Sequence, residues 1–87
     1  MQDPEVTTEF SDLLRAERER AGISQETLAA LAGLDRSAVG QLERAVTSPR
    51  LTSVIRLAGA LDLDPCALLP AVRWKPPSGS EGSFVKS

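Results

Sequence analysis

Residues 25–44 read QETLAALAGLDRSAVGQLER, and this stretch predicts two short amphipathic helices joined by a tight turn. Gly33 stands where the first helix has to end, because glycine adopts the left-handed backbone conformation without a Cβ clash. Asp35 stands where the second can begin, since its carboxylate accepts hydrogen bonds from the N–H groups of a helix start. The apolar positions expected to hold this corner together are Leu28, Ala29, Ala32, Leu34, Val39 and Leu42.

The composition favours one small helical domain. The chain has 87 residues, of which 41% are hydrophobic and only 3% aromatic, so leucine, alanine, valine and isoleucine must build the core. It has no histidine and one cysteine, which excludes a Cys/His metal site, a histidine-based catalytic triad and an internal disulfide. We therefore expect no metal, no cofactor, no enzymatic activity and a reducing, cytoplasmic location.

No membrane span or export signal is expected from the sequence. The apolar runs fall short of the ~18–20 residues that cross a bilayer. The first ten residues, MQDPEVTTEF, are acidic and lack the basic start and apolar stretch of a signal peptide.

The net charge of −2 conceals an uneven distribution. Residues 1–12 carry four acidic side chains and no basic one, whereas residues 13–61 carry seven arginines against five acidic residues. Residues 62–87 carry three of each sign. Arginine suits bidentate contacts with phosphate and guanine. The central region is therefore compatible with a nucleic-acid partner, although its field is weak.

Helical periodicity extends beyond the corner on both sides. Pro49 interrupts it after the corner, and Asp64-Pro65 is a helix-start signal. Five helices are predicted, over residues 10–21, 25–32, 36–44, 51–61 and 65–69. No stretch predicts a strand. We therefore expect an all-α fold, a compact five-helix bundle in which the second and third helices form a helix-turn-helix.

The two ends of the chain differ from this helical region. Residues 1–8 are expected to form a polar N-terminal arm, residues 9–70 the domain, and residues 71–87 a C-terminal tail. Proline, glycine and serine are frequent in that tail, which favours flexibility. Large apolar residues are out of character for a linker and predict docking on the chain's own domain, a second subunit or a protein partner: Trp74, Phe84 and Val85.

These residues together resemble the lambda-repressor-like, or XRE-type, helix-turn-helix family from about Leu14 to Leu69. The resemblance implies a five-helix fold and sequence-specific binding of double-stranded DNA, usually as a homodimer. It implies a transcriptional regulator, a repressor, with its third helix in the major groove of a palindromic operator. The pattern is carried by Arg18, Gly22-Ile23-Ser24-Gln25, Leu28-Ala29, Gly33, Arg36-Ser37, Glu43, Pro49, Leu61-Asp62-Leu63-Asp64 and Leu68-Leu69.

The exposed side of the third helix is expected to read bases. Arg36, Ser37 and Gln41 lie on one side of that helix, opposite its apolar residues. Arginine spans O6 and N7 of guanine, and glutamine binds N6 and N7 of adenine. Gly40 lies on the same side, where a missing side chain would let the helix approach the floor of the groove. The competing interpretation is an ordinary solvated helix face.

Contacts with the DNA backbone are expected from five further residues. Gln25 begins the second helix, where its side chain and the N–H groups of the helix start would grip a phosphate. The others lie at the end of the third helix and in the loop after it: Arg44, Thr47, Ser48 and Arg50. Such contacts add affinity and salt dependence without sequence choice. A solvated surface is the alternative for each of them.

Arg18 and Glu43 are interpreted as a structural ion pair. The resemblance implies that this partly buried pair joins the first helix to the end of the third. The alternative is two exposed charges that contribute almost nothing. Two positions depart from the family pattern, because Ala45 replaces a helix-ending glycine and Arg50 replaces a small capping residue.

Cys66 is expected to be a small buried residue of the fifth helix. A redox role is the alternative, because a thiol near a helix N-terminus has a lowered pKa. The resemblance also implies a dimer surface at this end, formed by Leu63, Cys66, Ala67 and Leu69. A different function remains open, in which the same fold serves as an antitoxin or another protein-interaction module. The acidic pI near 5.0 and the apolar residues of the tail favour it.

Overall fold

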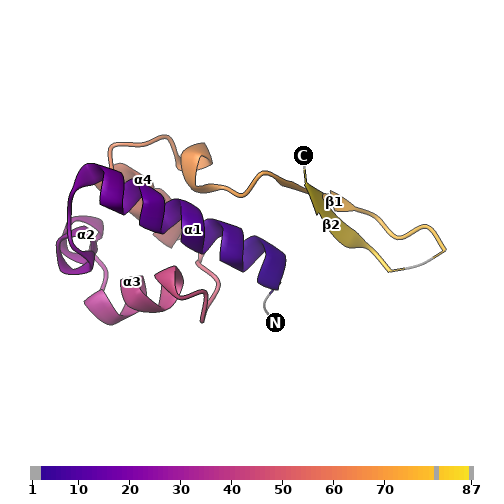
Figure 1. The fold of residues 1–87 in the computed structure, drawn as a ribbon, viewed down its shortest axis with the longest axis horizontal. Coiled ribbons are helices and arrows are strands. Elements are labelled where there is room, and N and C mark those ends of the chain that lie inside the picture. The colour runs from indigo at the N-terminus through magenta and orange to yellow at the C-terminus, as the bar shows by residue number, and fades with distance from the viewer. Residues whose placement is uncertain (1–2, 80, 87) are drawn as a thin grey trace.

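The structure, a computed structural model, describes residues 3–79 and 81–86. Its helical body consists of α1 (Pro4–Ala21), α2 (Gln25–Ala32), α3 (Arg36–Glu43) and α4 (Leu51–Ala60). A 3-10 turn, η1 (Pro65–Leu68), follows, and then two antiparallel strands, β1 (Val72–Lys75) and β2 (Ser83–Lys86). Figure 1 shows this hairpin projecting away from the helices. The molecule is therefore elongated and measures 47 × 22 × 19 Å.

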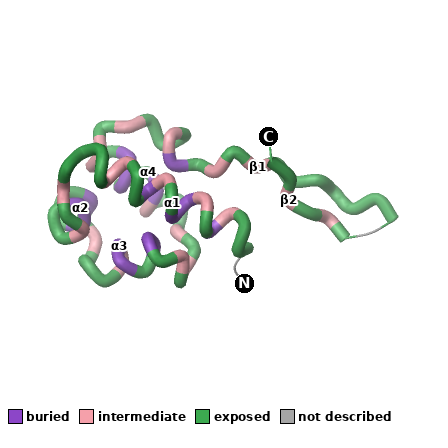
Figure 2. The backbone as a smooth tube through the Cα atoms, in the orientation of Figure 1, coloured by how far each residue is buried: buried purple, intermediate pink, exposed green. Residues whose placement is uncertain are grey.

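The core lies where the helices and η1 meet (Figure 2). α2 packs against both α3 and α4, while η1 packs against α4 and α1. Full burial of each large apolar side chain stabilises such a core by roughly 1.5–3 kcal/mol. The buried apolar residues are Phe10, Leu14, Leu28, Ala29, Ala32, Val39, Leu42, Val54, Leu57, Ala58 and Leu68.

The helix ends at the corner follow local sequence signals, with one exception. Gly33 ends α2 in the left-handed conformation, at φ +70°. Ser24 caps the start of α2, because its Oγ accepts a hydrogen bond from the N–H of Thr27 at 3.0 Å. α3 begins directly after Asp35, but the Asp35 side chain makes no capping hydrogen bond. The expectation that this carboxylate caps α3 is therefore wrong.

The prediction of an all-α bundle with five helices is wrong. The segment expected to be the fifth helix is the four-residue 3-10 turn η1, which begins after Asp64. Pro70 drives the preceding residue, Leu69, into an extended conformation, at φ −88° and ψ 133°. The few residues left between Pro65 and Leu69 cannot build the successive i to i−4 hydrogen bonds of an α-helix.

The prediction of a polar N-terminal arm over residues 1–8 is also wrong. α1 already begins at Pro4, a residue type favoured in the first helical turn because its missing N–H has no helical partner there. Thr7 is buried, and this first part of the helix packs on the loop after α3 through a contact between Thr7 Oγ1 and Ser48 Oγ at 3.0 Å. Residues 1–2 of the expected arm lie outside the described residues.

The predicted flexible tail contains a β-hairpin. Its register pairs Val72 with Lys86 and Trp74 with Phe84. The rings of Trp74 and Phe84 meet edge to face with their centroids 5.2 Å apart. This cross-strand contact is favourable for a hairpin, and it explains two aromatic residues that are unusual in a linker.

Cys66 is exposed, and the expectation that it is buried is wrong. Hydrogen bonding to Asp64 and the negative charge of that carboxylate raise the pKa of the Cys66 thiol. The lowered pKa behind the redox alternative is therefore not found. Among the other residues expected at a dimer surface, Leu63 and Ala67 are half-buried and Leu69 is exposed.

Candidate nucleic-acid interface

α3 is divided lengthwise into a buried and an exposed half. Successive residues of an α-helix are rotated by about 100°, so residues three and four apart share a side. The buried half consists of Val39, Leu42 and Glu43. Gly40 lies on the side of Arg36 and Arg44, as expected, but it is buried because the side chains of Gln25 and Arg44 lie beside it. The exposed half, extended by the residue that follows the helix, consists of Arg36, Ser37, Gln41 and Arg44.

Glu43 is the centre of a polar network on the buried side. Only 2% of this residue is exposed. Arg18 donates from Nε to Glu43 Oε2 at 2.6 Å and from Nη2 to Oε1 at 3.0 Å. Arg18 Nη1 also donates to the carbonyl of Ile23 at 3.0 Å, and Arg15 Nη2 to the backbone carbonyl of Glu43 at 2.6 Å. The structure thus brings Arg18 and Glu43 together and joins α1 to the end of α3.

The electrostatics of this network favour an ionised Glu43. Burial by itself raises the pKa of the carboxyl, but hydrogen bonds from Arg18 and Gln25 and the charges of Arg18 and Arg15 outweigh it. The pKa of Glu43 therefore lies below its ordinary value. The hydrogen bond to Glu43 likewise raises the pKa of Arg18.

Gln25 belongs to the same network. It is the first residue of α2, and its Nε2 donates to Glu43 Oε1 at 3.0 Å. A Cβ on Gly40 would lie 3.7 Å from Gln25 Oε1 and 3.2 Å from Arg44 Nη1. The missing side chain of Gly40 therefore admits these two side chains beside α3. The side-chain amide of Gln25, which was expected to bind a phosphate, thus donates a hydrogen bond to Glu43 instead.

The other residues expected at a DNA backbone surround the end of α3. Arg44 and Arg50 are exposed, and Thr47 is half-buried. Gln41, Thr47, Ser48 and Arg50, but not Arg44, line a hollow of about 420 Å³ between α3 and the start of α4. Ala45 turns the chain here with φ +59°, a left-handed conformation that costs roughly 1–2 kcal/mol for a residue with a Cβ.

Sequence reasoning missed three residues of α1 that position α3. Arg15 binds the carbonyl of Glu43, Ser11 Oγ donates to the carbonyl of Leu42, and Thr7 contacts Ser48 of the following loop. Together with Arg18 they recur at intervals of four, four and three residues. These polar residues recur at helical spacing beside the apolar Phe10 and Leu14. That spacing is the signal that could have identified them as polar contacts from α1 to α3 and the loop after it.

The described residues were also searched for a metal site and for a membrane-spanning helix. Within residues 3–79 and 81–86, no three metal-ligating side chains gather. In the same part of the chain, none of the helices has both the length and the apolar character needed to traverse a bilayer.

Comparison with known proteins identifies the family. The profile of the helix-turn-helix family matches residues 14–68. The uncharacterized HTH-type transcriptional regulator y4dL of Sinorhizobium fredii is 40% identical over 83 residues, which cover 91% of this chain and 42% of that protein. The chain thus spans less than half the length of this relative.

Two solved structures share the fold. The restriction-modification controller protein C.AhdI of Aeromonas hydrophila superposes with a TM-score of 0.71 at 46% identity, covering 72% of this chain and 96% of that one. The P22 c2 repressor, in complex with synthetic operator 9T, superposes with a TM-score of 0.64 at 32% identity, covering 69% and 91%. The chain therefore belongs to the lambda-repressor-like helix-turn-helix family.

Proposed function

We propose that this chain binds double-stranded DNA with sequence preference through the exposed half of α3 and acts in transcriptional regulation. The observation that carries the proposal is the division of α3. The Glu43 network fixes one half of the helix, while Arg36, Ser37 and Gln41 are presented to solvent on the other. The names of y4dL, as a transcriptional regulator, and of the P22 c2 repressor, bound to an operator, support the same role.

In this proposal some of the exposed residues contact bases and the others contact phosphates. Arg36 binds O6 and N7 of a guanine, and Gln41 binds N6 and N7 of an adenine. Ser37 contacts a base or a phosphate. The remaining contacts go to phosphates, where they add affinity without sequence choice. They come from Arg44, Thr47, Ser48, Arg50 and the start of α2 at Gln25.

We further propose that two copies act together. A homodimer would place its two α3 helices in successive major grooves, about 34 Å apart, on a palindromic operator. A regulator that covers promoter DNA in this way acts as a repressor and works in the cytoplasm, where that DNA is.

Selection of bound sequences from a random duplex library tests the proposal. We expect an enriched palindrome with half-sites about one helical turn apart. Enrichment of a single half-site would retain DNA binding and contradict the homodimer. No enrichment would contradict DNA reading and favour a protein-interaction module.

A matched pair of variants links that result to α3. Arg36→Ala should remove the preference at one base position. Arg20→Ala removes the same charge from an exposed position in α1 and should leave the enriched sequence unchanged. Affinity for the enriched duplex should also fall with rising salt concentration, as phosphate contacts require.

A further inference from the structure

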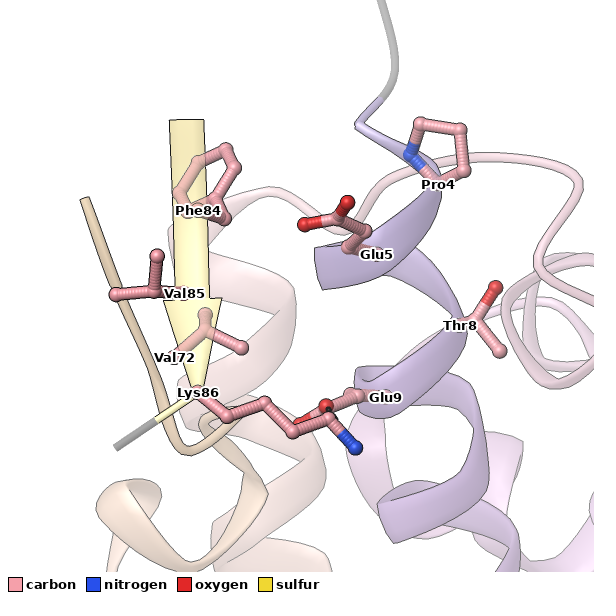
Figure 3. A pocket seen from close by; sticks show the side chains of 8 residues that line it. All are labelled: Pro4, Glu5, Thr8, Glu9, Val72, Phe84, Val85 and Lys86. Atoms are coloured by element: carbon pink, nitrogen blue, oxygen red, sulfur yellow. Dashed lines mark ion pairs between the residues drawn. The ribbon is translucent and has the colours of Figure 1, made fainter. Parts of the chain in front are cut away.

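The β-hairpin turns one of its two faces toward the start of α1. Side chains alternate between the faces of a strand, and directly paired residues share a face. The register pairs Val72 with Lys86 and Trp74 with Phe84, so these four residues stand on one face. Between them they line two adjoining spaces that separate the hairpin from the first turns of α1 (Figure 3). Both spaces therefore have this face on one side and α1 on the other.

The smaller of the two spaces has aromatic rings on one side and carboxylates on the other. Its volume is about 290 Å³, and it is lined by Trp74 and Phe84 of the hairpin and by Asp3 and Glu5 at the start of α1. The larger space, about 530 Å³, adds Val72 on the hairpin side and shares Phe84 and Glu5. Pockets of roughly 300–1,000 Å³ hold small molecules in proteins. The hairpin and α1 therefore leave room between them for a small ligand.

Gly82 allows the Trp74 ring to take its position in this space. A Cβ at Gly82 would lie 2.2 Å from Trp74 Cζ2 and 3.1 Å from the carbonyl oxygen of Lys75, so a side chain there would displace the ring. The ring also meets that of Phe84 edge to face, with the centroids 5.2 Å apart. Trp74 is nevertheless 55% exposed. A large aromatic ring that is packed on two sides and open on another is a preformed binding surface.

The carboxylates opposite the rings lack a cation. In the described part of the chain, the side chains of Asp3 and Glu5 take part in none of the ion pairs. Lys86 lies over the larger space, where its Nζ is 3.8 Å from Glu9 Oε1. Figure 3 shows the Glu5 side chain pointing from α1 toward β2. The start of a helix favours acidic residues, but that preference does not account for an aromatic pair facing them.

We propose that the space between the hairpin and α1 binds a small organic cation, an ammonium ion that carries alkyl groups on its nitrogen. Aromatic faces attract such an ion, and tryptophan attracts it most strongly. The carboxylates of Asp3 and Glu5 supply the opposite charge. The alkyl groups are apolar, so they can contact Trp74, Phe84 and, in the larger space, Val72.

Two other occupants fit these walls less well. A bare metal ion takes several oxygen ligands around it, and within the residues that the structure describes no three metal-ligating side chains gather. A neutral apolar molecule would cover two carboxylates without supplying a charge for them, and desolvating an unpaired charge costs free energy. The pairing of rings with carboxylates therefore favours an organic cation.

This site lies outside residues 14–68, which match the helix-turn-helix family. It is formed by the first turns of α1 and by the hairpin, and it needs neither DNA nor a second copy of the chain. A chain that fails to bind the cation would still be able to read DNA through α3. The two proposals therefore fail separately.

Titration with choline, without DNA, tests the site through the fluorescence of Trp74, the only tryptophan. Choline chloride replaces sodium chloride at constant ionic strength, so that only the identity of the cation changes. The matched neutral probe is 3,3-dimethylbutan-1-ol, in which a carbon atom stands in place of the choline nitrogen. We expect a saturable change of Trp74 emission with choline and none with the alcohol. No change with choline, or an equal response to both probes, overturns the proposal.

Backbone amide signals in nuclear magnetic resonance spectra locate the bound cation. Addition of choline should shift the signals of residues 3–9 and 72–86, which line the two spaces or lie beside them. The signals of α3 should stay in place. Shifts confined to other parts of the chain would overturn the assignment of this site.

Removal of one carboxylate tests the role of charge. Glu5→Gln keeps the size of the side chain and removes its charge, so the dissociation constant for choline should rise about threefold or more. The matched control, Glu26→Gln, makes the same change in the first turn of α2 and should leave the constant unaltered. Equal constants for both variants contradict the proposal.

Displacement of the aromatic ring tests the role of Trp74. Gly82→Ala puts a Cβ where the ring lies, so it should raise the dissociation constant about threefold or more while every charge is kept. Gly59→Ala, where a Cβ meets nothing within 4 Å, is the control and should leave binding unaltered. Unaltered binding in Gly82→Ala contradicts a contact with Trp74. If this substitution opens the hairpin, the comparison of Glu5→Gln with its control decides the proposal by itself.

Discussion

The two halves of α3 differ in what holds their side chains. On the buried half, the Glu43 carboxylate alone accepts three hydrogen bonds, from Arg18 and Gln25. On the exposed half, Arg36 and Gln41 are presented to solvent. In the proposed function one short helix serves both the fold and DNA binding, because different residues would carry each task. A substitution on the buried half should change stability, and one on the exposed half should change the choice of DNA sequence.

Removal of the Glu43 carboxylate should have the largest effect. Glu43→Ala leaves Arg18, whose side chain is 15% exposed, without its partner, and the free energy of unfolding should fall by about 3–5 kcal/mol. Urea denaturation measures the change. The matched control, Glu26→Ala, removes an exposed carboxylate from α2 and should alter stability by less than about 0.5 kcal/mol. Similar values for both variants would contradict a structural role for the buried half.

Gln25 lies between the two halves and should affect both properties. Gln25→Ala removes one hydrogen bond to a charged carboxylate, which is worth about 1.5–3 kcal/mol of stability. It should also weaken binding to specific and random duplexes by the same factor, as loss of a phosphate contact would. Denaturation and titration with both duplexes measure these effects. Unchanged stability would assign Gln25 to the DNA-binding half alone.

The pH dependence of stability should reveal the lowered pKa of Glu43. Its contribution is fully present above the pKa of an unfolded glutamate, about 4.3, and is lost as the pH falls through the lower folded value. The unfolding free energy of the native chain should therefore decline with acid more steeply than that of Glu43→Gln. Denaturation midpoints measured from neutral pH into the acid range test this. Parallel curves would mean that Glu43 is not stabilised as an anion.

The smallest effect is expected at the end of α3. Ala45→Gly relieves the left-handed conformation at φ +59°, but it also adds conformational freedom to the unfolded chain. The net gain in stability should be about 0.5–1 kcal/mol. Ala16→Gly, at an exposed position within α1, should instead cost about 1 kcal/mol. A loss of stability at both positions would show that Ala45 carries no strain.

The sequence allowed the corner and its core to be predicted because their signals are local. Ser24 and Gly33 mark helix ends through their own backbone and side-chain chemistry. The apolar residues of α2 and α3 recur at helical spacing, and the structure buries Leu28, Val39 and Leu42. The same spacing placed Arg36 and Gln41 on an exposed side.

The errors arise where distant residues decide the outcome. η1 is short because Pro70 acts on Leu69, and the hairpin forms because Trp74 meets Phe84 across a loop rich in proline and glycine. At the site, Arg15 and Ser11 act on α3 from another helix. Periodicity within one segment does not reveal such partners.

The double substitution Arg36→Ala and Gln41→Ala tests the division of α3 most directly. Each residue is expected to supply about 1–3 kcal/mol of base discrimination. The ratio of affinities for the selected and a random duplex should therefore fall about a hundredfold or more, at one fixed salt concentration. The free energy of unfolding should change by less than about 0.5 kcal/mol per site. An unchanged affinity ratio in a folded variant would contradict base reading by the exposed half of α3.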